Sequence, residues 1–281
     1  MRPPLQQKLP LVENISFIAQ TFRTPDFEVG WHQHIEYELI LFTEGSGQSF
    51  IGNYVGEFET GDVYFLGSDL PHTFQKREPD LVTSAVVVQF RGDFWGNELL
   101  ALPEGREIRH LLEISAQGLK MPAPVKLQLA PLIREMEKAI GFKRLLLLGE
   151  CLDKMAGKTS YEPLSTQVIA YSDNRERENL DRVFEFTINN FREKIELAAV
   201  AKLVYMSEPA FCNFFKRCTK KTYIAFLNEV RVGYACNLLV DTKKTVLDIC
   251  YKSGYNTMAH FHKQFLKLKK LTPLQYRKLF E

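Results

Sequence analysis

Residues 249–277 read ICYKSGYNTMAHFHKQFLKLKKLTPLQYR, and this stretch decides the fold of the C-terminal part of the chain. The apolar residues between Val246 and Cys250 predict a short helix, and Gly254 predicts its end. Asn256 or Thr257 can cap a second helix. The stripe predicted to be buried on that helix consists of Phe261, Phe265 and Leu268. The residues predicted to face away from it are Ala259, His260, Lys263 and Lys267, with His262 on the flank. Two short helices joined by a tight turn predict a helix-turn-helix unit.

The same pattern occurs about fifty residues earlier in the chain. The segment from Leu197 to Val204 predicts a helix, and Tyr205-Met206 predicts a turn. Ser207 is a good N-cap for the next helix, where Pro209 is tolerated in the first turn. The predicted buried stripe consists of Phe211, Phe214, Phe215 and Cys218. The predicted outward face consists of Pro209, Asn213, Lys216, Arg217 and Lys220. This helix would present polar and basic groups outward, as a helix that enters the major groove of DNA must.

The segments around the two units support the same interpretation. A long amphipathic helix is predicted from Thr222 to Val240, between the units, and Thr272-Pro273 predicts the start of a closing helix. The net charge of +2 conceals an asymmetry, because residues 176–281 hold 19 Lys or Arg and 11 Asp or Glu, whereas residues 1–175 hold 17 and 23. A basic C-terminal part beside an acidic N-terminal part suggests that the former meets a polyanion.

These motifs resemble the AraC/XylS family of bacterial transcription regulators over about residues 178–280. The residues that carry the resemblance are Ser207–Lys216, Arg231, Ile249–Tyr255, Phe261, Phe265 and Leu271–Arg277. The chain departs from the family pattern at Asn213, Cys250 and Leu266, and in the turn Val204-Tyr205-Met206, which affects base preference rather than fold. The resemblance implies that both recognition helices contact adjacent major-groove segments on one face of the duplex. The DNA-binding residues that it implies are Ser207, Pro209, Cys212, Asn213, Lys216, Arg217, Asn256, Met258, Ala259, His260, His262, Lys263 and Lys267.

The N-terminal part has a different texture. From about Phe17 to Phe90, short runs of Val, Ile, Phe and Tyr alternate with Gly, Asn and Asp, which predicts an all-β sandwich or barrel. From Pro124 to Met155 the apolar period becomes helical. We therefore expect a multidomain chain: an all-β barrel in residues 1–103, a helical connector and linker in residues 104–177, and an all-α domain with two helix-turn-helix units in residues 178–281.

Histidines and carboxylates cluster in the strand-rich part. Residues 31–38 read WHQHIEYE, and His72 follows later. Since alternate side chains of a strand share a face, His32, His34, Glu36 and Glu38 are predicted to point one way. Three imidazoles and a carboxylate suit a divalent metal such as Zn, Ni, Mn or Fe(II). In the alternative, the histidines hydrogen-bond Asp62 or Glu38 and no metal is held.

The spacing of this cluster resembles the cupin barrel over roughly residues 20–90. That resemblance implies a metal held by His32, His34, Glu38 and His72, and many regulators pair a cupin-like sensor with an AraC-type DNA-binding module. The mouth of a pocket would also carry aromatic side chains that suit a sugar or another small organic ligand; the candidates are Trp31, Tyr37, Phe42 and Tyr64. The predicted ligand-binding residues are Trp31, His32, His34, Tyr37, Glu38 and His72.

Cellular context follows from composition. The N-terminus lacks the apolar core of a signal peptide, and the longest apolar run, Leu145 to Leu148, is too short to span a bilayer. The five cysteines form no CxxC pair, which favours reduced thiols in the cytoplasm over disulfides or a zinc site.

Two functions remain at this stage. The first is a ligand-responsive transcription factor, not an enzyme, with duplex DNA, a small-molecule effector such as a sugar, and RNA polymerase as partners. A homodimer is expected. The apolar stripe from Leu127 to Leu148 is a candidate dimer interface, and the alternative is that this stripe packs inside one chain. The alternative is a metal-dependent cupin enzyme that carries a DNA-binding domain.

Overall fold

The structure is a computed structural model, and it describes residues 16–24, 27, 30–76, 80–156, 161, 163–165 and 174–280. The chain divides into two compact units, whose main parts are residues 5–168, apart from 55–57, and residues 169–281. Each unit is described separately below. The extreme N-terminus and most of the segment 157–177, predicted as a linker, lie outside the described residues.

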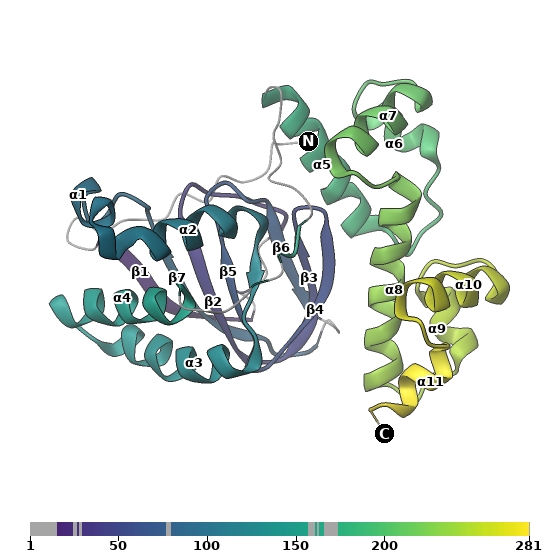
Figure 1. The fold of residues 1–281 in the computed structure, drawn as a ribbon. Helices are drawn as coiled ribbons and strands as arrows, with labels where there is room; N and C mark the ends of the chain where they lie inside the picture. Colours follow the sequence, from purple (N-terminus) through teal and green to yellow (C-terminus); the bar gives the residue numbers. More distant parts are fainter. Residues whose placement is uncertain are drawn as a thin grey trace. The chain divides into compact units, whose positions relative to one another are not determined.

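The N-terminal unit contains two antiparallel sheets (Figure 1). The five-stranded sheet has the order β1-β7-β2-β5-β8, and its strands are β1 (Phe17–Arg23), β7 (Ser84–Phe90), β2 (Tyr37–Glu44), β5 (Val63–Leu66) and β8 (Leu119–Lys120). The three-stranded sheet has the order β4-β3-β6, with β4 (Tyr54–Glu59), β3 (Ser46–Ile51) and β6 (His72–Lys76). The prediction of an all-β N-terminal domain is therefore confirmed.

Helices cover one face of the five-stranded sheet. They are α1 (Asn97–Ala101), α2 (Arg106–Ile114), α3 (Ala123–Lys138) and α4 (Phe142–Ala156). Leu39 and Leu41 of β2 belong to the core shared with these helices, whereas Ile40 and Phe42 belong to the core between the two sheets. Because successive strand residues point to opposite faces, a sheet covered on both sides reads as a continuous apolar run.

The apolar stripe from Leu127 to Leu148 has two parts. Leu129, Ile133 and Met136 are buried in the core of their own unit. Ile140 and Phe142, at the turn between α3 and α4, are 86% and 70% exposed. Leu147 and Leu148 are buried in the same core, so intrachain packing accounts for most of the stripe but not for the turn.

One buried carboxylate links α3 to the five-stranded sheet. Asp62 accepts hydrogen bonds from Lys120 Nζ at 2.6 Å and Lys126 Nζ at 2.9 Å. The histidines therefore do not use Asp62 as a partner, contrary to one branch of the alternative considered above.

The C-terminal unit is entirely helical, as predicted (Figure 1). Its helices are α5 (Asn174–Asn190), α6 (Leu197–Leu203), α7 (Glu208–Thr219), α8 (Tyr223–Asp241), α9 (Val246–Lys252), α10 (Met258–Lys269) and α11 (Pro273–Lys278). Several helix starts are capped by side-chain hydroxyls: Ser207 accepts from Ala210 N, Thr257 from His260 N, and Thr272 from Gln275 N. No helix in the described part of the chain is long and apolar enough to cross a membrane.

Two arginines perform the same task at equivalent places of this unit. Arg231 on α8 donates to Phe191 O at 2.8 Å and Glu193 O at 2.9 Å, in the loop before α6. Arg277 on α11 donates to Leu239 O at 3.1 Å and Lys244 O at 2.7 Å, at the end of α8 and in the loop before α9. Each guanidinium thus satisfies backbone carbonyls that the preceding helix leaves unpaired.

Candidate nucleic-acid interface and histidine cluster

The first helix-turn-helix consists of α6 and α7. Phe211, Phe214 and Phe215 are buried on α7, as the sequence pattern predicts. The Phe211 ring packs against Tyr223, and the Phe215 ring packs against Phe184 and Phe226 from neighbouring helices. Cys212, Asn213 and Lys216 are exposed on the other side of the same helix. The burial of the aromatic stripe therefore sets which α7 residues can reach a partner.

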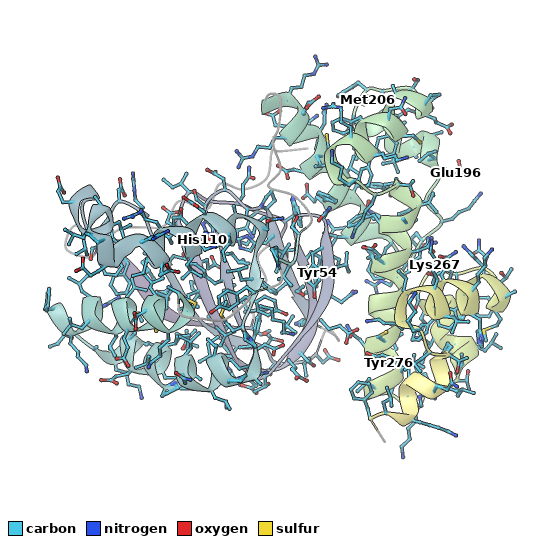
Figure 2. All side chains as sticks on the ribbon, viewed as in Figure 1. Tyr54, His110, Glu196, Met206, Lys267 and Tyr276 are labelled. Carbon is cyan, nitrogen blue, oxygen red and sulfur yellow. The ribbon has the colours of Figure 1, made fainter. Side chains whose placement is uncertain are left out.

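The second unit repeats this arrangement on α9 and α10. Phe261 and Phe265 are fully buried, whereas Ala259, His260 and Lys263 are exposed. Met258 and His262 are half-buried, and His262 Nε2 has no hydrogen-bond partner among the described residues. Figure 2 labels Lys267 on α10 and Met206 immediately before the cap of α7. All thirteen sequence-predicted DNA-binding positions are thus at least partly accessible in this unit.

Arg217 is already engaged. Its guanidinium forms a two-pronged hydrogen bond with the Glu176 carboxylate on α5. Residues 41 positions apart are paired here, which the sequence pattern of α7 alone could not reveal. Any contact of Arg217 with a phosphate would have to displace Glu176.

Helix α8 joins the two helix-turn-helix units through polar contacts. Tyr255, in the turn of the second unit, donates its hydroxyl to Asn228 Oδ1 on α8 at 3.0 Å. The guanidinium of Arg231 lies 5.6 Å from the centre of the Tyr255 ring. The same arginine is bonded to the loop before α6, so one side chain contacts the entry to the first unit and the turn of the second. These contacts tie both helix-turn-helix units to α8.

The histidine cluster lies in the N-terminal unit. His32 and His34 do not lie in a strand, contrary to the prediction, because β2 begins only at Tyr37. The loop is held instead by a bridge between His32 and His72, with backbone hydrogen bonds of 3.1 and 2.9 Å. The four predicted ligands are all buried, and one ligand atom of each lies within 4.8 Å of the others. The structure thus brings together His32, His34, Glu38 and His72.

Each imidazole is oriented by a backbone carbonyl. The Nδ1 atoms of His32, His34 and His72 lie 2.9, 3.0 and 2.8 Å from the carbonyl oxygens of Gly30, Glu36 and Leu70. Because a carbonyl oxygen only accepts, each Nδ1 carries the proton. His72 Nε2 is buried, has no hydrogen-bond partner among the described residues and lies 3.6 Å from Glu38 Oε1. His34 Nε2 lies 2.7 Å from Glu38 Oε2.

Three members of the cluster have shifted pKa values, and the cause differs from one to the next. Burial, together with the charge of His72, lowers the pKa of His32 to about 3. Burial opposes a charge on His34, but the hydrogen bond and charge of Glu38 outweigh burial and raise the pKa of His34. Burial would raise the pKa of Glu38, but His34 and His72 hold that pKa well below its usual value. The hydrogen bond between His34 and Glu38 therefore favours the charged form of both groups.

Gln89 is a member of the cluster that sequence reasoning missed. Its Nε2 donates to Glu38 Oε2 and lies 3.2 Å from His34 Nε2. Gln89 lies on β7 directly opposite Glu38 on β2. Only the strand pairing brings it there, so no local pattern in the sequence could have identified it.

The aromatic residues predicted to line a pocket are part of the core. Trp31, Phe42 and Tyr64 are buried, and Phe42 stacks on Phe58 with ring centres 4.0 Å apart. Tyr37 stacks on Phe65 and Phe90 in the core under the helices. It precedes Glu38 on the strand and lies on the opposite face of the sheet from the histidines, so the structure does not bring it to the cluster.

Comparison with known proteins gives two domain matches. The family model of the AraC-like ligand binding domain matches residues 14–147, and that of a helix-turn-helix domain matches residues 200–279. The uncharacterised HTH-type transcriptional regulator YdeC of Bacillus subtilis (strain 168) is 30% identical over 90 residues, which cover 32% of this chain and 31% of YdeC. The melibiose operon regulatory protein of Escherichia coli (strain K12) is 27% identical over 100 residues, which cover 36% of this chain and 33% of that protein.

A third relative matches over most of its length. The HTH-type transcriptional activator RhaR of Mannheimia succiniciproducens is 22% identical over 250 residues, which cover 89% of this chain and 87% of RhaR. The chain matches only about a third of the length of the first two relatives. By their names, all three are regulators of transcription, and none of them supports the alternative of a cupin enzyme.

Proposed function

This chain belongs to the AraC family of transcription regulators, and we propose that it binds duplex DNA through α7 and α10 and responds to a ligand of its N-terminal unit. The observation that carries the proposal is the repeated division of two helices into a buried aromatic stripe and an exposed polar, basic face, with α8 between them. Lysine contacts to phosphates would supply much of the affinity, and base edges would supply the specificity.

Genomic footprinting of the wild-type protein and of a Lys216→Ala/Lys263→Ala variant tests DNA binding. A Lys138→Ala/Lys143→Ala variant removes the same charge from the N-terminal unit and serves as the control. We expect discrete protected sites for the wild type and the control, and their loss in the first variant. Sites that persist unchanged in the Lys216→Ala/Lys263→Ala variant would show that α7 and α10 do not carry the binding.

For the N-terminal unit we propose that His32, His34, Glu38 and His72 hold a divalent metal such as Zn, Ni, Mn or Fe(II). The supporting observation is the anchoring of all three Nδ1 atoms on backbone carbonyls, which is how proteins orient metal-binding imidazoles. The Nε2 of His72, buried without a hydrogen-bond partner among the described residues, is available as a ligand atom. A metal would take the place of the hydrogen bond between His34 and Glu38 and would supply the counter-charge of the carboxylate.

Titration of metal-stripped protein with Co²⁺ or Zn²⁺ decides between this proposal and a purely hydrogen-bonded cluster. We expect one equivalent to bind to the wild type and to a control, His110→Ala, whose imidazole is exposed on α2. We expect His72→Ala to bind far more weakly. Absence of binding to the wild type would favour the hydrogen-bonded cluster, in which His34 and Glu38 form an ion pair.

We further propose a homodimer and an organic effector. The exposed Ile140, Phe142 and Leu146 form an apolar surface at the turn between α3 and α4, which suits a second copy of the chain. Ile140→Asp/Phe142→Asp is expected to sediment as a folded monomer, and an unchanged sedimentation coefficient would exclude this surface.

The name of the melibiose operon relative supports a sugar as a candidate effector. RNA polymerase as a partner and the cytoplasm as location remain predictions.

A further inference from the structure

Four non-glycine residues in the described part of the chain have left-handed backbone conformations. They are Asp69, Tyr205, Lys220 and Lys270, with φ of 57°, 57°, 55° and 59°. The last three lie in the C-terminal unit: Lys220 and Lys270 directly follow α7 and α10, and Tyr205 follows the C-cap of α6. Residues with a Cβ adopt this conformation at a cost that glycine avoids. Such outliers persist where the side chain serves a purpose.

Tyr205 and Gly254 occupy the same position of the two units. In the first unit Met206 N donates to Ala201 O at 2.9 Å, and in the second Tyr255 N donates to Cys250 O at 3.2 Å. Both bonds span five residues and close the end of the first helix around the left-handed residue. Gly254 is required there, because an added Cβ would lie 2.4 Å from Phe191 O. Position 205 carries a side chain in the same backbone conformation, although glycine would adopt it with less strain.

The Tyr205 side chain does not contribute to packing. It is 83% exposed, and its hydroxyl has no hydrogen-bond partner in the described part of the chain. It precedes the N-cap of α7 by two residues. At Tyr205, therefore, a strained backbone conformation carries an aromatic side chain that faces solvent beside the recognition helix α7.

Lys220 and Lys270 end the two recognition helices in the same way. Their backbone N–H groups donate to Lys216 O and Leu266 O, both at 2.9 Å. Their Nζ atoms lie 3.2 Å from Arg217 O and 3.0 Å from Lys267 O, so each ammonium lies at the C-terminal end of its helix. Both lysines are exposed. Both recognition helices thus end on a lysine at a position where glycine would be less strained, which suggests that the two lysines have the same function.

We propose that Tyr205, Lys220 and Lys270 contact the DNA backbone at the ends of the two recognition helices. The lysines do so through phosphate charge, and Tyr205 through its hydroxyl on a phosphate oxygen. The proposal rests on the proposed DNA binding of α7 and α10. It assigns these side chains to register and affinity rather than to base recognition.

Binding of wild-type protein and of Tyr205→Gly, Lys220→Gly and Lys270→Gly to a protected site from the genomic footprint tests this. We expect each variant to melt at or above the wild-type temperature, because backbone strain is relieved. Each should bind the duplex about three- to tenfold more weakly at moderate salt. Each lysine variant should also reduce the slope of log K against log salt by about 0.9, the value for one lost phosphate contact, and Tyr205→Gly should leave that slope unchanged.

Three further variants make the outcome decisive. Lys220→Asn keeps a residue that tolerates the left-handed conformation and removes only the charge, so it should bind DNA as weakly as Lys220→Gly. Tyr205→Phe should bind as weakly as Tyr205→Gly if the hydroxyl is the contact. Asp69→Gly relieves the same strain in the N-terminal unit and should leave DNA affinity unchanged. Glycine variants with wild-type affinity and salt slope would overturn this proposal alone, whereas a wild-type protein that does not bind the site would overturn DNA binding itself.

Discussion

At the scale of single residues, the account depends on how each side chain is oriented. His32, His34 and His72 were identifiable from sequence as metal-ligand types. Strand alternation predicted that His32 and His34 point the same way as Glu38, but both lie in a loop, and His72 was joined to them only by the resemblance to the cupin barrel. Their orientation comes from three backbone carbonyls and from Gln89 across the sheet. The residue types are visible in the sequence, whereas the hydrogen-bond partners depend on chain pairing.

Gln89→Leu removes the amide that holds Glu38 while retaining a side chain of similar size. We expect its affinity for Co²⁺ to fall by about 10- to 100-fold, the usual effect of losing a group that orients a metal ligand. Gln117→Leu makes the same change at a glutamine of this unit whose amide donates to Ser165 O at 2.8 Å, and it should bind Co²⁺ like the wild type. Equal affinities of the two variants would show that Gln89 has no part in the site.

The pH dependence of metal-stripped protein tests the burial of His32. Its pKa is about 3 in the folded chain and near 6.5 when unfolded, so between these values the unfolded state binds more protons. Stability should therefore rise with pH over this range, by at most about 1.4 kcal/mol per pH unit from this group, and be lost as pH falls. Urea unfolding from pH 4 to 6 should show a smaller slope for His32→Gln. An identical slope would mean that His32 does not titrate in this way.

At the scale of elements, amphipathic period predicted α7 and α10 well, because a buried aromatic every three or four residues admits one orientation only. The N-caps Ser207 and Thr257 were readable for the same local reason. Residues 32–38 were treated as alternating strand, but only Tyr37 and Glu38 of them belong to β2, since the residues before Tyr37 alternate between apolar and polar without belonging to a strand. Local pattern thus predicts the type of an element better than its ends.

Gly254 tests the turn that separates the helices of the second unit. Its φ is 81°, and a Cβ there would meet Phe191 O at 2.4 Å. We expect Gly254→Ala to lower the free energy of unfolding by at least about 2 kcal/mol, from left-handed strain and the clash together. Gly141→Ala is the control, because its φ of 59° is similar but no atom lies within 4 Å of the added Cβ. Equal costs in chemical denaturation would show that the clash is relieved.

At the scale of the whole molecule, composition and period predicted a β-rich unit followed by a helical one, and both are present. The sequence left open whether the stripe from Leu127 to Leu148 packs inside one chain. It does so in part, because Leu129, Ile133 and Met136 contribute to the core beside the five-stranded sheet. An apolar stripe on a helix shows that one face of the helix is covered, but it does not show which part of the protein covers that face. The packing partners of the stripe could therefore not be predicted from the sequence.

The central claim is that α8 holds two reading helices at a fixed separation. Hydroxyl-radical footprinting on a site found in the genome measures this directly. We predict two protected patches on one face of the duplex, about 10 base pairs apart. Lys216→Ala should weaken protection mainly in one patch and Lys263→Ala mainly in the other. A single protected groove, or two patches on opposite faces of the duplex, would contradict the account.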